Sequence, residues 1–214
     1  MSEVIESGGS GAVRSEQLLQ CWSCKGPVDR RALFCHTCAA IQPPHGIDHF
    51  ARLGLAARFD VAPEEIERNY FGFQRILHPD RFAAKSAREK ALSQAQAAAL
   101  NDAYETLRDP VRRAIHLLER LGAPMPGDDH TIADPELLME AMEARETLAE
   151  ARTAEAIDAL VARADADADR TKAELTDRFD DGDLDAARTA VLRLRYLDKL
   201  RDEARTRRTR LERA

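Results

Sequence analysis

The strongest constraint on this fold is a His-Pro-Asp tripeptide that lies between two helix-forming stretches. Apolar residues recur every three or four positions through 66–77 and again through 92–107, which is the pattern of one buried helix face. Pro79 cannot continue the first helix, and it disfavours helical geometry at His78. The sequence therefore predicts two antiparallel helices joined by a rigid polar turn, with His78 and Asp80 presented to solvent.

By itself the tripeptide would also fit an ordinary helical hairpin, because so short a motif is weak. Its surroundings are more specific. Tyr70 lies two turns ahead, a short element at 48–55 precedes both helices, and the second helix continues through 100–110 as Leu-Asn-Asp-Ala-Tyr-Glu-Thr-Leu-Arg-Asp-Pro. Together these features resemble a J-domain, expected here at 46–121, the module with which co-chaperones stimulate ATP hydrolysis by DnaK-class chaperones. The resemblance implies a chaperone-binding site made of His78, Pro79, Asp80, Arg75 and Arg81.

One part of this J-like region departs from the common pattern. Generic J-domains carry a basic pair directly after the tyrosine of their second helix, whereas this chain has Phe71 and Gly72 there. The basic residues that remain nearby are Arg68, Arg75 and Arg81. A weaker positive field steers less strongly toward an acidic surface, so we expect a dedicated chaperone partner rather than a general one.

Two Cys-x-x-Cys pairs, separated by ten residues, lie ahead of the J-like region. Pairs with this spacing bring four thiolates around one zinc ion, and four protein ligands leave no open position for a substrate. We therefore expect a structural zinc knuckle within 16–45, ending in the stiff Pro43-Pro44 linker. Two disulfides are the alternative, which a chain without an export signal disfavours. The predicted zinc ligands are Cys21, Cys24, Cys35 and Cys38.

Composition and charge narrow the function classes further. Ala, Leu, Arg and Glu dominate, which favours helix over sheet, so the predicted fold is all-α. A net charge of -6 argues against nucleic-acid binding, which depends on clustered Lys and Arg. No apolar run approaches the roughly 20 residues of a membrane-spanning helix. Residues 1–15 predict a disordered leader with neither a signal nor a transit pattern, so the cytosol is the expected compartment.

The second half of the chain predicts a separate helical domain at 135–214. Turn-forming residues fill 122–134, which we interpret as a hinge, and Asp134 with Pro135 supplies a helix start. Three helices with short connections imply a small antiparallel bundle. The expected helices span 135–151, 153–180 and 184–212.

The first of these helices has two different faces at about 100° per residue. One face carries small and apolar residues and fits the bundle interior. The opposite face, called the docking face below, combines apolar side chains with glutamates, and apolar surface of this kind is costly unless something covers it. One alternative is burial against the J-like region; the other, which we favour, is docking of a client protein, in which methionines adapt and glutamates fix the partner's register. The docking face comprises Leu138, Met139, Met142, Glu143, Glu146 and Glu150.

The segments 138–146 and 191–200, together with the His130-Thr131 hinge, are similar to the C-terminal domain of the HscB family, the J-type co-chaperones of iron–sulfur cluster biogenesis. The resemblance implies that the bundle binds an IscU-type scaffold protein and that the tripeptide docks on an HscA- or DnaK-class ATPase chaperone, with Asp80 near a chaperone arginine. It also implies a co-chaperone rather than an enzyme. The family's scaffold-binding positions fall on Leu138, Met139, Met142, Glu143, Glu146, Glu150 and Tyr196.

Two of these positions depart mildly from the family, which often has Leu where Met142 stands and Phe where Tyr196 stands. The four-cysteine leader is similar to that of eukaryotic and some bacterial members. The alternatives are a J-protein with a broader client range and a zinc-linked interaction protein that carries the same hairpin. The sequence contains no Gly-rich phosphate loop, and acid–base chemistry by His78 and Asp80 lacks a pocket and a third orienting group.

Overall fold

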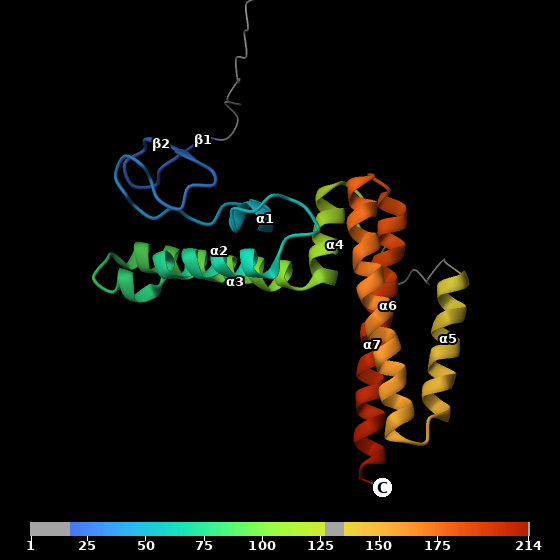
Figure 1. Cartoon of the computed structure of the whole chain (residues 1–214). Coiled ribbons are helices and arrows are strands. Elements are labelled where there is room, and N and C mark those ends of the chain that lie inside the picture. The colour runs from blue at the N-terminus through green and yellow to red at the C-terminus, as the bar shows by residue number, and fades with distance from the viewer. Residues whose placement is uncertain (1–17, 127–134, 214) are drawn as a thin grey trace, which may run out of the picture. The chain divides into compact units, whose positions relative to one another are not determined.

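The computed structural model describes residues 18–126 and 135–213 (Figure 1). Within these ranges the chain is mostly helical, which confirms the predicted fold class, and it adds two short antiparallel strands that the sequence analysis does not anticipate. None of the described helices combines the length and apolar character needed to cross a membrane. In chain order the elements are β1 (Leu18–Gln20), β2 (Pro27–Asp29), α1 (His49–Arg52), α2 (Pro63–Leu77), the 3-10 helix η2 (Pro79–Phe82), α3 (Ala87–Arg108), α4 (Pro110–Arg120), α5 (Pro135–Glu150), α6 (Ala154–Asp180) and α7 (Leu184–Leu211).

The chain divides into two compact units. Unit 1 comprises Met1–Ile47 and Gln74–Ala99, and unit 2 comprises Asp48–Phe73 and Leu100–Ala214. Unit 1 therefore contains the four cysteines, the His-Pro-Asp turn and the parts of α2 and α3 next to that turn, whereas unit 2 contains the rest of α2 and α3, together with α1 and the helices α4 to α7. The predicted limits of the knuckle, the J-like region and the C-terminal domain stay predictions. The predicted leader and most of the predicted hinge lie outside the described residues.

The helices that flank the turn run antiparallel, as expected. In unit 1 the hydroxyl of Ser93 donates to the carbonyl oxygen of Leu77 (2.8 Å). In unit 2 the hydroxyl of Tyr70 donates to Oδ1 of Asn101 (2.9 Å), and its ring stacks on Tyr104 with centroids 4.1 Å apart. Later residues of α2 thus meet earlier residues of α3, which fixes the opposite directions of the two helices.

Local sequence sets the ends of the bundle helices. The N-cap Thr153 accepts a hydrogen bond from the backbone N–H of Ala156 at the start of α6, and Asp183 accepts from Ala186 at the start of α7. Gly182 has a φ of 73°, a left-handed conformation that glycine adopts without strain. Because these signals are local, α5, α6 and α7 lie within about one residue of their predicted bounds.

Within unit 2, J-like residues pack on the ends of α6 and α7 (Figure 1). The ring of Phe59 lies 5.7 Å from that of Phe179 near the end of α6, and the guanidinium of Arg113 in α4 lies 5.1 Å from the Phe59 ring centroid. Arg188 of α7 donates to the carbonyl oxygen of Ala123 (3.2 Å). These contacts leave the docking face of α5 uninvolved.

A histidine pair joins α1 to α4 in unit 2. The backbone N–H of His49 donates to Nε2 of His116 (3.2 Å), so this nitrogen carries no proton of its own. Burial lowers the pKa of His49, and positive charge on His116 lowers it further, while Asp102 opposes the shift. Burial also lowers the pKa of His116, against the opposing effect of Asp48 and Glu119. Folding therefore favours the neutral form of both imidazoles.

We expect the free energy of unfolding to fall as the pH is lowered from about 7.5 to about 5.5. The pKa values of both histidines lie below the ordinary 6.5 in the folded chain. The unfolded chain therefore binds more protons in this window, and stability is lost as the pH falls. Urea unfolding at each pH measures the effect. His116→Gln keeps an acceptor that takes up no proton, so its stability should depend less on pH; an unchanged dependence would contradict the assignment.

Candidate functional site

The side chains of the four cysteines converge in unit 1. All four sulfur atoms lie within 4.8 Å of one another, and the Cys21–Cys38 and Cys24–Cys35 sulfur pairs are each 3.7 Å apart. A tetrahedron with metal–sulfur distances of about 2.3 Å places its sulfur atoms about 3.8 Å apart. A disulfide would need about 2.05 Å, and all four thiols are free. The arrangement therefore fits one metal ion and does not fit the alternative of two disulfides.

The backbone explains why the sulfur atoms converge. Each Cys-x-x-Cys pair forms the same tight turn, in which Lys25 donates its N–H to the carbonyl oxygen of Cys21 (3.0 Å) and Ala39 donates to that of Cys35 (2.8 Å). Both turns end in the left-handed region, with φ of 62° at Lys25 and 57° at Ala39. Side chains other than glycine adopt this conformation at a cost in free energy. This strained turn directs both sulfur atoms of each pair toward one point.

Hydrogen bonds to sulfur favour the thiolate form that binds metals. Sγ of Cys21 accepts from the backbone N–H of Ser23 (3.4 Å) and from the side-chain amide of Gln42 (3.4 Å). Burial raises the pKa of Cys21, but backbone hydrogen bonds from Cys24 and Ser23, together with the amide of Gln42, outweigh it and lower the pKa to about 6. Four sulfur ligands suit a soft or borderline metal ion.

The His-Pro-Asp turn lies at the surface of unit 1. Nδ1 of His78 accepts a hydrogen bond from the backbone N–H of Asp80 (3.3 Å), which caps the start of η2. The side chains of His78 and Asp80 are 54% and 91% exposed, as the sequence predicts, and Phe82 is buried at the other end of the turn. The remaining residues of the predicted chaperone site, Arg75, Pro79 and Arg81, are exposed as well.

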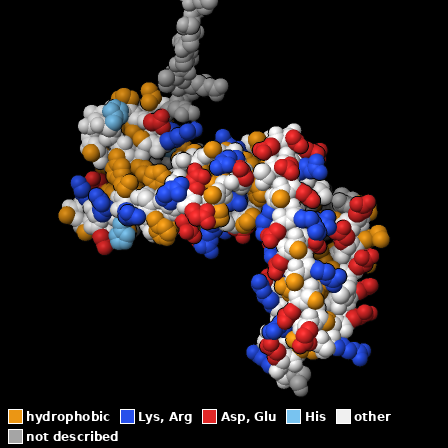
Figure 2. Space-filling model, viewed as in Figure 1, with side chains coloured by type: hydrophobic (Ala, Val, Ile, Leu, Met, Phe, Trp, Pro, Cys, Tyr) orange, Lys and Arg blue, Asp and Glu red, His pale blue; other side chains and the backbone are white. Residues whose placement is uncertain are grey.

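The docking face of α5 is open to solvent. Leu138, Met139 and Met142 are 40%, 62% and 56% exposed, whereas the opposite stripe of α5 is buried toward the bundle. Figure 2 shows acidic side chains along the outer edge of α5. The alternative in which this face is buried is therefore wrong for the structure described. The acidic members of the face, all exposed, are Glu143, Glu146 and Glu150.

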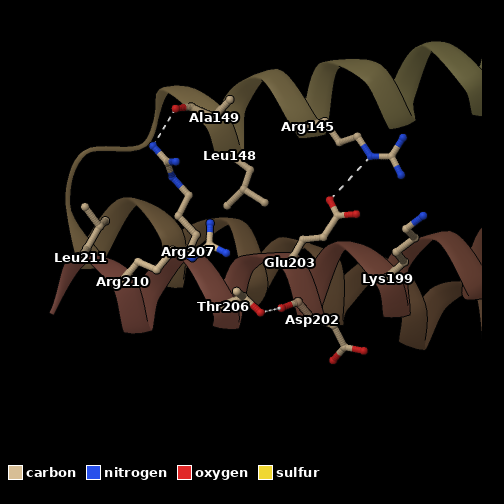
Figure 3. Close-up of a pocket in the computed structure, with 10 residues that line it drawn as sticks. All are labelled: Arg145, Leu148, Ala149, Lys199, Asp202, Glu203, Thr206, Arg207, Arg210 and Leu211. Carbon is tan, nitrogen blue, oxygen red and sulfur yellow. Dashed lines mark hydrogen bonds and ion pairs between the residues drawn. The ribbon is translucent and has the colours of Figure 1, made fainter. Parts of the chain in front are cut away.

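Contacts with α7 fix the rotation of α5 (Figure 3). Leu148 is buried, and Nε of Arg145 lies 3.6 Å from the carboxylate of Glu203. Nη2 of Arg207 donates to the carbonyl oxygen of Ala149 (2.7 Å), which satisfies an acceptor at the C-terminal end of α5. These contacts border a groove of about 780 Å³ between the two helices. Because α5 is held on this side, its docking face points to solvent.

Tyr196 lies on α7, whereas the other predicted scaffold-binding residues lie on α5. It is half-buried in α7, and its hydroxyl donates to the carbonyl oxygen of Ala141 on the inner side of α5 (3.4 Å). Burial raises the pKa of Tyr196. With Glu143 it borders a cavity of about 280 Å³ among the three bundle helices. The structure thus brings six predicted residues together on α5 and places Tyr196 on the bundle side of that helix.

Sequence analysis missed two residues that contact the cysteine knuckle. Gln42 is buried beside Cys21, and Nε1 of Trp22 donates to the carbonyl oxygen of Ile41 (2.6 Å). The only signal for Gln42 is a polar residue between the apolar Ala40-Ile41 and two prolines. That signal does not reveal burial, because a polar residue before a proline linker is usually exposed.

Comparisons with known proteins give consistent matches. A family model described as the HSCB C-terminal oligomerisation domain matches residues 133–205. The mouse iron–sulfur cluster co-chaperone protein HscB is 30% identical over 200 residues, which cover 91% of this chain and 86% of the mouse protein. The crystal structure of the human co-chaperone protein HscB has a TM-score of 0.81 at 29% identity, covering 88% of this chain and 98% of the human one. The structure of the chaperone HscB from Vibrio cholerae has a TM-score of 0.68 at 32% identity, covering 77% and 99%.

We expect Ala39→Gly to stabilise the knuckle by about 0.5–1 kcal/mol, because relief of left-handed strain exceeds the added backbone entropy of the unfolded chain. The chain has one tryptophan, Trp22, so its fluorescence reports unfolding of the knuckle. The matched control is Ala40→Gly, because Ala40 lies outside the left-handed region and should lose stability. Elemental analysis should find one metal ion per chain in all three proteins. Equal effects of the two glycines would contradict the strain argument.

Proposed function

Because the chain belongs to the HscB family of iron–sulfur cluster co-chaperones, we propose that it brings an IscU-type scaffold protein to an HscA- or DnaK-class chaperone and stimulates the ATPase of that chaperone. The docking face of α5 binds the scaffold, and the His-Pro-Asp turn binds the chaperone. The observation that carries the proposal is the open docking face, where apolar and acidic side chains share one surface. ATP is hydrolysed by the chaperone, and this chain is its activator rather than an enzyme.

The chemistry of the docking face defines the scaffold surface that fits it. Leu138, Met139 and Met142 offer apolar contact area, and unbranched methionine side chains adapt to an irregular partner. The glutamates beside them favour a partner surface that carries Lys or Arg around an apolar centre, which sets register and speeds encounter. Tyr196 supports this face from the bundle side, because its hydroxyl holds the backbone of α5 at Ala141.

The geometry of the turn suits capture of a cation on the chaperone. The carboxylate of Asp80 is almost fully exposed, so a guanidinium can approach it and form charge-assisted hydrogen bonds. His78 accepts the backbone N–H of Asp80, which holds the Asp80 backbone in one position. Pro79 at the first position of η2 limits the backbone freedom of the turn. The residues thus divide into one that carries the charge and two that position it.

The exposed surface of α2 supports a dedicated chaperone partner. Phe71, which stands where generic J-domains have a basic residue, is 46% exposed, and Gly72 beside it is also exposed. An exposed aromatic ring recognises shape and apolar surface, whereas a basic pair recognises any acidic patch.

Zinc is the metal that the cysteine site supports best. Four thiolates at tetrahedral spacing match structural zinc sites, in which every coordination position belongs to the protein. Bound zinc would supply folding free energy to a segment of this size. Elemental analysis of the purified chain should identify the ion as zinc.

We expect the double variant Leu138→Ala, Met142→Ala to bind a purified IscU-type scaffold at least roughly tenfold more weakly, because each truncation removes apolar area from the contact. Calorimetric titration measures the affinity. The matched control is Leu121→Ala. Leu121 is 48% exposed, but it caps the C-terminal end of α4 and is not part of the docking face, so its truncation should leave scaffold affinity unchanged. Charge reversal of Glu143 and Glu146 should also weaken binding, and more so at low salt. Full scaffold affinity in both the alanine double variant and the charge-reversal variant would refute the docking-face assignment. A J-protein with a broader client range would then be the remaining hypothesis.

We expect Asp80→Asn to abolish most of the stimulation of chaperone ATP turnover, because the substitution keeps the shape of the side chain and removes its charge. Scaffold affinity should not change, since the docking face lies in unit 2. Glu67→Gln, at an exposed carboxylate of α2, is the control for loss of one negative charge. Undiminished stimulation by Asp80→Asn, measured as steady-state phosphate release, would refute the role given to Asp80.

A further inference from the structure

The cysteine knuckle is joined to α3 by a buried polar contact within unit 1. Gln42 donates its side-chain amide to Sγ of Cys21 (3.4 Å) and to the carbonyl oxygen of Ala40 (2.8 Å). The backbone carbonyl of Gln42 accepts a hydrogen bond from the side-chain amide of Gln96 in α3 (2.9 Å). Gln42 and Gln96 are 1% and 3% exposed, so water cannot replace a lost partner unless the segment opens. Gln42 thus links a metal ligand to α3.

About one turn before Gln96, α3 makes a second buried contact, this time with the start of the His-Pro-Asp turn. Ser93 is fully buried and donates to the carbonyl oxygen of Leu77 (2.8 Å). Leu77 is the last residue of α2, and its carbonyl lacks a partner within the helix, because the N–H groups of Asp80 and Arg81 bond to Nδ1 and the carbonyl oxygen of His78 instead. Ser93 therefore satisfies this carbonyl and fixes the point at which the turn leaves α2.

A third contact joins the knuckle to α3 nearer the surface. The guanidinium of Arg88 in α3 lies 4.3 Å from the ring centroid of Trp22, which stands inside the first Cys-x-x-Cys pair. Trp22 in turn donates to the carbonyl oxygen of Ile41 (2.6 Å). The knuckle thus contacts α3 at Arg88 and at Gln96, on both sides of Ser93 along the helix.

From these contacts we propose that the metal site controls the geometry of the His-Pro-Asp turn, so that the chain is a metal-dependent activator of its chaperone. This coupling rests on the chaperone role of the turn proposed above. Gln42, Gln96 and Ser93 are positioning residues, which act through the carbonyl of Leu77. The four cysteines would hold the metal, and a knuckle ordered in this way would keep Gln42 in place through Cys21. Gln42 accepts from Gln96, and α3 presents Ser93 to the carbonyl of Leu77 at the start of the turn.

The knuckle needs the metal because it has little apolar core. A segment this small cannot bury enough apolar surface to hold its shape without a metal or a cross-link. When it loosens, the buried amide of Gln96 loses its acceptor, and the part of α3 that carries Ser93 is no longer fixed. One buried cluster of the knuckle consists of Cys21, Val28 and Cys35, with Leu19 and Ala32 packed against it, and Ala40 and Ile41 are the other buried apolar residues of this segment.

Thermodynamic linkage gives this coupling a second, independent consequence. If bound metal favours the turn geometry that docks on the chaperone, then chaperone binding must raise the affinity for metal by the same factor. A factor of about ten is within the usual range for coupled sites. A knuckle that only folds its own segment would show neither effect. The reciprocal measurement therefore separates coupling from simple structural support.

The first test compares the zinc-loaded full chain with the same chain stripped by a chelator under reducing conditions. We expect the stripped chain to need about ten times more protein for half-maximal stimulation of chaperone ATP turnover. Amide hydrogen exchange at 78–82 should be faster in the stripped chain than in the zinc-loaded chain. This measurement needs no chaperone. Scaffold affinity should stay the same, because the docking face lies in unit 2. Equal exchange at 78–82 in both forms would overturn the proposal.

The second test uses a matched pair of glutamines in α3. Gln96→Leu removes the donor to Gln42, whereas Gln94→Leu makes the same change at an exposed position of the same helix. Removal of the metal should raise the concentration needed for half-maximal stimulation of chaperone ATP turnover in Gln94→Leu as it does in the native chain. In Gln96→Leu the same treatment should change that concentration little. Ser93→Ala, a milder change, should speed exchange at 78–82 with metal release unaltered. A Gln96→Leu variant that keeps the full metal dependence would refute the relay.

Failure of the coupling and failure of the chaperone role give different results. If the zinc-loaded chain stimulates no chaperone, the proposed function of the turn fails, and exchange at 78–82 still decides whether metal orders it. If the zinc-loaded chain stimulates the chaperone and the stripped chain does so equally well, the function stands and the coupling is wrong. Chaperone at saturating concentration should slow zinc release to a chelator in the native chain, and an unaltered rate would also count against the coupling.

Discussion

The end of α2 is the constraint on which the arrangement of unit 1 depends. Pro79 stops the helix, and the carbonyl of Leu77 is left in a buried place where an unpaired acceptor would cost about 1–3 kcal/mol. Ser93 supplies the missing donor, and this single contact fixes the register of α3 against the end of α2. Because the knuckle is fastened to the same stretch of α3, the position of the cysteines follows from that register. Buried polar contacts of α3 thus fix the position of the exposed turn.

The two candidate functional surfaces are built in different ways. Around the turn, buried polar side chains that hydrogen-bond to backbone carbonyls specify the geometry, and close by stand four cysteines that could hold a metal ion. In the bundle, ordinary amphipathic packing holds α5 in place. The inner stripe of α5 is buried, Arg145 of α5 pairs with Glu203 of α7, and Arg207 of α7 donates to the backbone of α5 at Ala149, while the remaining face is left open. Stability of the bundle therefore does not depend on the docking face, which can be specialised for a partner.

Features with local causes could be predicted from the sequence, whereas contacts between distant residues could not. Thr153 and Gly182 set helix ends by their own chemistry, and the cysteine spacing alone indicates one metal site. The contact between Gln42 and Gln96 joins residues 54 positions apart, and no periodicity indicates it. Tyr196 was predicted as a site residue only from the family resemblance. Its half-buried position follows from helix packing that the sequence pattern does not specify. The strands β1 and β2 were missed because three residues each give too short a pattern.

The choice of methionine on α5 has a chemical consequence. Met139 and Met142 are the two most exposed large apolar residues of that helix, so peroxide in solution has access to them. Oxidation to the sulfoxide makes each side chain polar, and methionine sulfoxide reductases reverse the change. Neither side chain belongs to the bundle core, so oxidation would leave the molecule folded while making the proposed scaffold contact more polar. A leucine in either place would have been inert to such chemistry.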